Sequence, residues 1–99
     1  MDTSPKTVAW IFYAVAMASQ VAPAPRRGIS EVADGINHAV PTQQELNGSL
    51  RLLQARGLVQ ADGASFSLSS AGLMLLSSAR AGNSTVFSVW HALTKAFAK

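Results

Sequence analysis

Residues 8–18 (VAWIFYAVAMA) form an unbroken apolar run near the start of the chain. A membrane-spanning helix needs roughly 20 such residues, so we expect no membrane span here. A secretory signal peptide is the alternative, because the run has the length of its apolar region and residues 16–18 (AMA) resemble a cleavage site. The preceding residues carry Asp2 as well as Lys6, and three aromatic rings lie within the run. These features favour a buried helix.

The composition is typical of one globular domain over residues 1–99. Hydrophobic residues make up 48% of the chain and charged residues only 13%, about half the usual charged share of roughly 25%. A chain this apolar is not expected to be disordered, and its length suits a single domain. It contains no cysteine. This excludes a disulfide scaffold, a cysteine-ligated zinc site and a thiol nucleophile, and it fits a cytoplasmic protein.

The net charge of +3 is unevenly distributed along the chain. Residues 1–62 carry five basic and five acidic side chains, whereas residues 63–99 carry three basic and no acidic ones. A nucleic-acid-binding surface normally has Lys and Arg clustered on one face. The charge pattern alone therefore does not predict such a surface.

The apolar run belongs to a predicted helix over about residues 5–20. Ser4 and Pro5 are residues favoured at the cap and at the first position of a helix. Pro23 and Pro25 then end it. Because this helix is apolar nearly all round, we expect it to be buried on most sides.

A connector over residues 22–28 (APAPRRG) leads to a predicted second helix with Ser30 as its N-cap. We expect this helix to end near residues 37–38, because Pro41 disfavours helical geometry at Val40. A third helix follows, and Gly57 is the glycine that stops it. The N-terminal capping box and the apolar stripe of this third helix are formed by Thr42 with Glu45 and by Leu46, Leu50 and Leu53.

Residues 58–69 predict a β-hairpin. Residues 65–69 (SFSLS) alternate polar and apolar side chains, the period of a half-buried strand, and Asp62-Gly63 is a turn signal. Two further helices are expected, over residues 71–79 and about 85–97. The cap of the first is Ser69 or Ser70, and the apolar stripe of the second contains Val86, Val89, Trp90, Leu93 and Phe97.

A pair of helices followed at once by a hairpin resembles the winged helix-turn-helix superfamily, in particular MarR-like and related small bacterial regulators. Residues 46–59 (LNGSLRLLQARGLV) resemble the end of the recognition helix and its exit into the wing. Residues 66–72 (FSLSSAG) resemble the second wing strand and the following helix, with Ser69 where the family usually has Thr. The resemblance covers about residues 29–75 and implies a mainly α fold with a small β-hairpin wing and extra N- and C-terminal helices. The stretch 37–45 departs from the family by being longer than the usual turn of about three or four residues.

The resemblance implies a dimeric transcription regulator that binds double-stranded DNA, with the helix at residues 42–56 in the major groove. Gln and Asn can pair with adenine, Arg can pair with guanine, and Thr can contact phosphate or a thymine methyl. Residues 28–62 have a net charge of −2, which counts against strong phosphate binding. The predicted DNA-binding residues are Thr42, Gln43, Gln44, Asn47, Arg51, Arg26 and Arg27.

A protein-interaction or dimerisation module without DNA binding is the alternative. Two apolar helices flank the predicted winged-helix core, and a small domain hides only part of its apolar surface. Large aromatic residues are enriched at interfaces, although they can equally fill one core. The predicted interface of a homodimer comprises Trp10, Phe12, Trp90 and Phe97.

An enzyme is not expected from this sequence. His38 and His91 lie far apart, and no metalloprotease motif, nucleophile elbow or phosphate-binding glycine loop is present. Two histidines without cysteine make a poor metal-ligand set. We therefore predict no catalytic residues, no metal and no cofactor.

Overall fold

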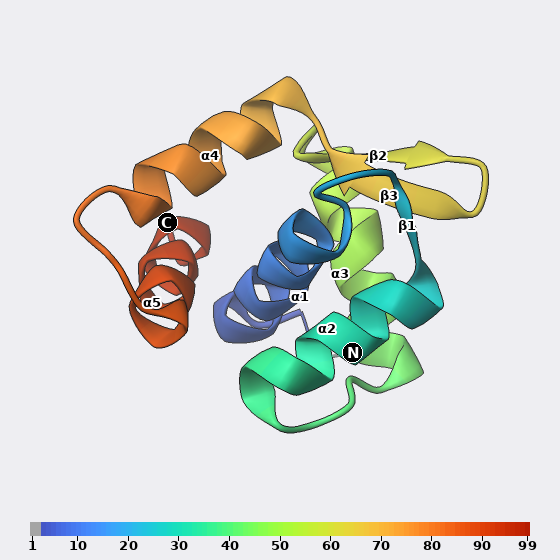
Figure 1. Ribbon diagram of the computed structural model, residues 1–99, viewed down its shortest axis with the longest axis horizontal. Helices are drawn as coiled ribbons and strands as arrows, with labels where there is room; N and C mark the ends of the chain where they lie inside the picture. Colours follow the sequence, from blue (N-terminus) through green and yellow to red (C-terminus); the bar gives the residue numbers. More distant parts are fainter. Residues whose placement is uncertain (1–2) are drawn as a thin grey trace.

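The computed structural model of the protein describes residues 3–99. It is mainly helical with a small antiparallel sheet of three strands, ordered β1-β3-β2 (Figure 1). This confirms the predicted mainly α fold with a β-hairpin. The elements are α1 (Pro5–Ala18), β1 (Ala24–Pro25), α2 (Arg26–Asn37), α3 (Gln43–Ala55), β2 (Val59–Asp62), β3 (Ser65–Leu68), α4 (Ser70–Arg80) and α5 (Val86–Phe97).

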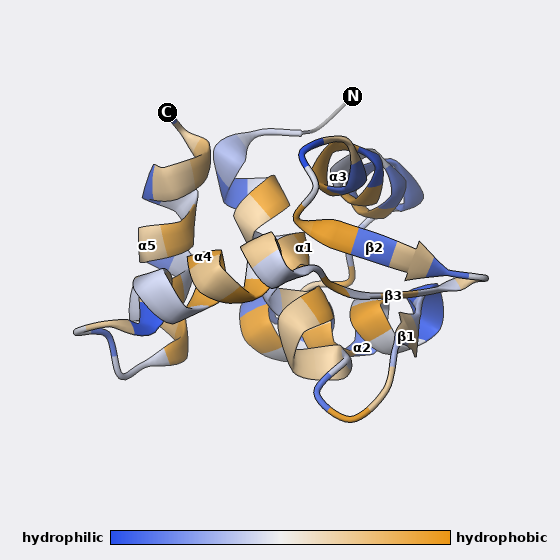
Figure 2. Cartoon of the chain, turned by 90° about the horizontal axis from the view of Figure 1, so that it is seen from above, coloured by the Kyte–Doolittle hydropathy of each residue, from blue (hydrophilic) through white to orange (hydrophobic). Residues whose placement is uncertain are grey.

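Helix α1 is the central element of the core. The Ser4 side chain accepts a hydrogen bond from the Thr7 N–H, and Pro5 occupies the first turn, as predicted. Every residue from 7 to 16 is buried, and the other helices lie around α1 (Figure 1). Figure 2 shows hydrophobic colouring along α1. The apolar run thus forms a buried helix, and no helix of the described chain is long and apolar enough to cross a membrane.

Helix α2 begins at Arg26, so the prediction that Ser30 caps this helix is wrong. Its N-cap is Pro25, whose extended backbone leads into the helix without a side-chain hydrogen bond. The first buried residue of α2 is Ile29, so one helical turn, residues 26–28, precedes the buried face of this helix. As a consequence, Arg26 and Arg27 belong to the first turn of α2 and not to a connector.

Helix α3 has the predicted caps and apolar stripe. The Glu45 N–H donates to Thr42 Oγ1 over 3.0 Å, and the Thr42 N–H donates to the Glu45 carboxylate over 2.9 Å. Gly57 follows the helix with a positive φ of 72°, which glycine adopts without strain. The stripe Leu46, Leu50 and Leu53 is buried.

The hairpin pairs Val59 with Leu68 and Asp62 with Ser65, so Gly63 and Ala64 form its tip. The predicted connector at residues 22–28 is only partly a loop. Its Ala24 pairs with Phe66 and adds the short strand β1 to the free edge of β3. Two residues are too few to show a strand pattern in sequence, so this pairing depends on the tertiary fold.

The four aromatic residues predicted as dimer anchors lie in the core of the single chain. Trp10 packs against Trp90 at 6.4 Å between ring centroids, and Phe12 packs edge-on against Phe97 at 5.6 Å. None of the four is more than 7% exposed. The structure thus gives these rings the alternative role of filling one core. On α5, the helix that carries Trp90 and Phe97, Val86 is 38% exposed. The predicted apolar stripe of this helix is therefore wrong at Val86.

Ser49 places a hydroxyl group in the interface between α3 and the core. It is fully buried, and its Oγ has no hydrogen-bond partner among the described residues. We expect Ser49→Ala to raise the free energy of unfolding by about 1 kcal/mol, because it removes an unsatisfied polar group and improves helix propensity. Urea unfolding of the wild type and of Ser49→Ala checks this. The exposed Ser77→Ala is the control, with a change of about 0.5 kcal/mol or less, and a loss of stability for Ser49→Ala would contradict the prediction.

Candidate nucleic-acid interface

The outward side of α3 carries a polar surface near its N-terminus. Gln43, Gln44 and Arg51 are exposed and Asn47 is half-buried. With Gly48 they line a depression of about 330 Å³. The leucine stripe faces the opposite way, into the core, so packing of α3 fixes the direction of this polar face.

Arg26 connects this face to α2 and to the sheet. Its Nε donates a 2.8 Å hydrogen bond to Asn47 Oδ1, and its guanidinium lies 4.9 Å from the centroid of the Phe66 ring. These contacts hold an exposed cation beside α3 and leave the Asn47 amide N–H groups to donate elsewhere. Pairing between residues 21 positions apart is not predictable from sequence, although Arg26 and Arg27 are both among the predicted DNA-binding residues.

Arg27 forms an ion pair with Glu31 one turn along α2, with a distance of 3.8 Å. The two side chains are 91% and 71% exposed, so the pair contributes little to stability and is easily exchanged for a phosphate contact. A second depression, of about 350 Å³, runs between α2 and α3. Its lining includes Arg26, Arg27, Gln43 and Asn47, so it continues the polar face of α3.

Acidic side chains are absent from the lining of both depressions, within the part of the chain that the structure describes. Glu45 accepts the Thr42 N–H in the capping box, and Asp62 lies at the end of β2 near the hairpin tip. The negative charge of residues 28–62 is therefore partly placed outside the polar face. We define this polar face by Arg26, Arg27, Gln43, Gln44, Asn47 and Arg51.

Thr42 adjoins the polar face but serves first as the cap of α3. Its hydroxyl oxygen accepts the Glu45 N–H, so its O–H donor and one lone pair are left for a ligand. The hairpin offers fewer groups that could contact a nucleic acid. Gln60 Nε2 donates to Ser67 Oγ over 3.4 Å, and residues 59–68 contain no Lys or Arg. The candidate site therefore comprises the polar face and Thr42.

The two histidines belong to different helices. His38 ends α2 in the left-handed region (φ 55°), with its backbone N–H bonded to Asp34 O, whereas His91 is exposed on α5. In residues 3–99, no three His, Asp or Glu side chains cluster in a way that could hold a metal ion.

Comparison with known proteins finds no matching family model, no matching curated protein and no matching solved structure.

Proposed function

We propose that this protein is a winged-helix DNA-binding protein that reads the major groove with α3. The observation that carries the proposal is the polar face, in which the exposed amides of α3 lie beside the two arginines that open α2. The element order α2, α3 and hairpin supports it, because this is the order of a helix-turn-helix followed by a wing. The buried Leu stripe leaves the amide-bearing side of α3 free for a ligand.

The residue types divide naturally between base and phosphate contacts. Gln43, Gln44 and Asn47 carry amides that recognise base edges in the major groove. Arg26 and Arg27 are placed to neutralise phosphates beside the groove, and Arg51 reaches either a guanine or a phosphate. With about three cations at the interface, binding is expected to be modest and strongly dependent on salt.

Fluorescence anisotropy with a short labelled duplex of random sequence tests this proposal. At low salt we expect binding, and Arg51→Ala weakens it roughly five- to tenfold while lowering the salt slope by about 0.9 for one lost phosphate contact. Arg80→Ala removes an equal charge from α4, outside the polar face, and is the matched control with unchanged affinity. Gln44→Ala is expected to act mainly on a selected specific sequence, by about 1–3 kcal/mol. Absence of binding at low salt, or equal losses for Arg51→Ala and Arg80→Ala, would overturn the proposal.

Self-association through α4 is a second candidate, favoured by exposed apolar side chains there. Leu73 is 57% and Met74 74% exposed, which is unusual for neighbouring large apolar residues of a monomer. A homodimer would also present two recognition helices to two half-sites. Sedimentation is expected to show a dimer that Met74→Glu converts to a monomer, whereas Gln54→Glu at an exposed position of α3 has no effect. A wild-type monomer at all concentrations would exclude this candidate.

A further inference from the structure

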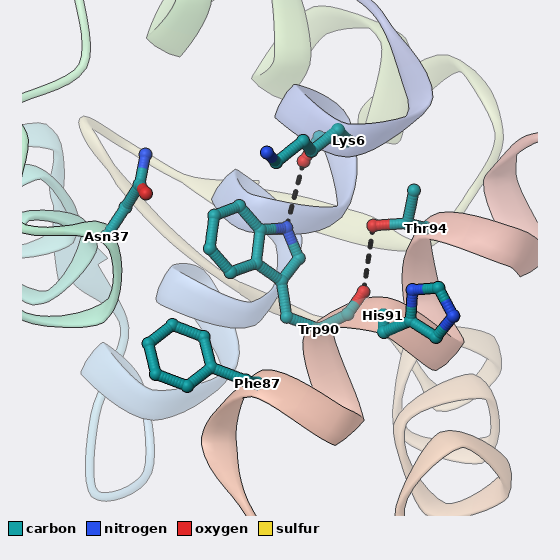
Figure 3. Close-up of a pocket in the computed structure, with 6 residues that line it drawn as sticks. All are labelled: Lys6, Asn37, Phe87, Trp90, His91 and Thr94. Carbon is teal, nitrogen blue, oxygen red and sulfur yellow. Dashed lines mark hydrogen bonds between the residues drawn. The ribbon is translucent and has the colours of Figure 1, made fainter.

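A hollow of about 450 Å³ lies where the start of α1, the end of α2 and one side of α5 meet. This volume lies within the range of pockets that hold small molecules, roughly 300–1,000 Å³. The hollow shares no residue with the polar face that we propose for DNA. Its lining consists of Lys6, Asn37, Phe87, Trp90, His91 and Thr94 (Figure 3).

Two aromatic rings form one wall of the hollow. Phe87 stacks on Trp90 with 6.4 Å between ring centroids and 27° between ring planes, yet 61% of Phe87 is exposed. Trp90 is held firmly, because its Nε1–H donates to the Lys6 carbonyl oxygen over 3.0 Å and its inner side packs on Trp10. Because Trp90 is only 7% exposed, the indole forms the fixed base of this wall, and the Phe87 ring offers the exposed surface for another flat ring.

The polar groups beside this wall are a cation and an amide. The Lys6 ammonium lies 5.5 Å from the centroid of the Trp90 ring. Figure 3 shows Asn37 facing Trp90 from α2, with Lys6 and Phe87 on either side of the indole. No Asp or Glu lines the hollow, and within residues 3–99 no carboxylate lies within ion-pair distance of Lys6. A ligand that complements these groups carries a negative charge.

We propose that this hollow binds a small planar aromatic anion. Its ring stacks on the exposed ring of Phe87 beside the buried indole of Trp90, its anionic group pairs with the Lys6 ammonium, and the Asn37 amide donates a further hydrogen bond. Carboxylates and sulfonates share the required chemistry. The proposal stands independently of DNA binding, because it uses none of the residues of the polar face.

NMR titration of the ¹⁵N-labelled protein with 2-naphthoate tests the proposal. The chain has two tryptophans and therefore two indole N–H signals, which Trp90→Phe assigns. We expect a saturable shift of the Trp90 signal, and roughly three- to tenfold weaker binding of the neutral analogue 2-naphthamide. The same titration with benzenesulfonate separates the two anion types, and a shift of the Trp90 signal with either one supports the shared chemistry.

Matched variants locate the two parts of the site. Lys6→Gln is expected to weaken 2-naphthoate binding roughly three- to tenfold, and Phe87→Ala about tenfold. Lys95→Gln removes the same charge from the exposed side of α5 outside the hollow, and we expect unchanged binding. Because Lys6 and Phe87 are exposed side chains, we expect their variants to fold like the wild type, and thermal unfolding checks this. A stationary Trp90 signal with both anions, equal affinity for 2-naphthamide, or equal effects of Lys6→Gln and Lys95→Gln would overturn the proposal.

Discussion

Trp10→Ala is expected to lower the free energy of unfolding by about 4 kcal/mol. Trp10 lies in the central helix and is only 4% exposed, so its removal leaves a large cavity in the core. Its Nε1–H donates a buried 2.9 Å hydrogen bond to the Ala33 carbonyl oxygen of α2. The substitution therefore also removes this hydrogen bond between α1 and α2.

Equilibrium unfolding in urea measures this loss, with two comparison variants. Trp10→Phe keeps most of the ring area but removes the indole donor, so we expect a loss of about 2 kcal/mol. Phe87→Ala, at an aromatic residue that is 61% exposed, is expected to lose about 1 kcal/mol or less. A dimer anchor would behave differently, because its effect would disappear when the protein is diluted. A Trp10→Ala protein as stable as the wild type, or an effect that depends on protein concentration, would contradict the core role of Trp10.

Gly72→Ala is the second substitution with a large expected effect, a loss of about 3 kcal/mol. An added Cβ would overlap the Leu58 carbonyl oxygen and would lie 3.3 Å from Leu68 Cβ. Backbone atoms cannot move aside as a flexible side chain does, so α4 would have to shift away from the hairpin. That shift would strain the 3.0 Å hydrogen bond from the Ser69 N–H to the Leu58 carbonyl oxygen.

Gly35→Ala is the matched control for Gly72→Ala. Gly35 also lies in a helix, but a Cβ at this position would meet no atom within 4 Å. Because alanine is the better helix former, we expect a gain of about 0.5–1 kcal/mol. Opposite signs for the two variants in thermal or urea unfolding support the close approach at Gly72. A neutral Gly72→Ala would show that α4 is not held against Leu58.

The local signals in the sequence were sufficient to predict most helix ends and the hairpin. The Thr42–Glu45 capping box, the Leu stripe and Gly57 act over a few residues, and the structure confirms all three. The same holds for the cap of α4, predicted at Ser69 or Ser70: the Ser69 hydroxyl accepts the Gly72 N–H. Such features are visible in a single sequence because both partners lie close together along the chain.

Features that depend on distant partners were missed. The start of α2 is set by Pro25 and by the pairing of Ala24 with Phe66, some forty residues away along the chain. The placement of Trp10 and Trp90 inside one core likewise depends on how α5 returns to α1. In the candidate site, the amides of α3 were predicted from the helix pattern. The contact of Arg26 with Asn47 requires the tertiary fold.

The most direct test of the proposed function is an NMR titration of the ¹⁵N-labelled protein with duplex DNA at low salt. We predict that the amide signals of residues 26–27 and 43–51 shift together, with smaller shifts at the hairpin tip, residues 62–65. Signals of α4 and α5 are predicted to remain in place, and added salt is predicted to reverse the shifts. No shift at low salt, or shifts centred on α4 and α5, would contradict the proposal that α3 binds DNA.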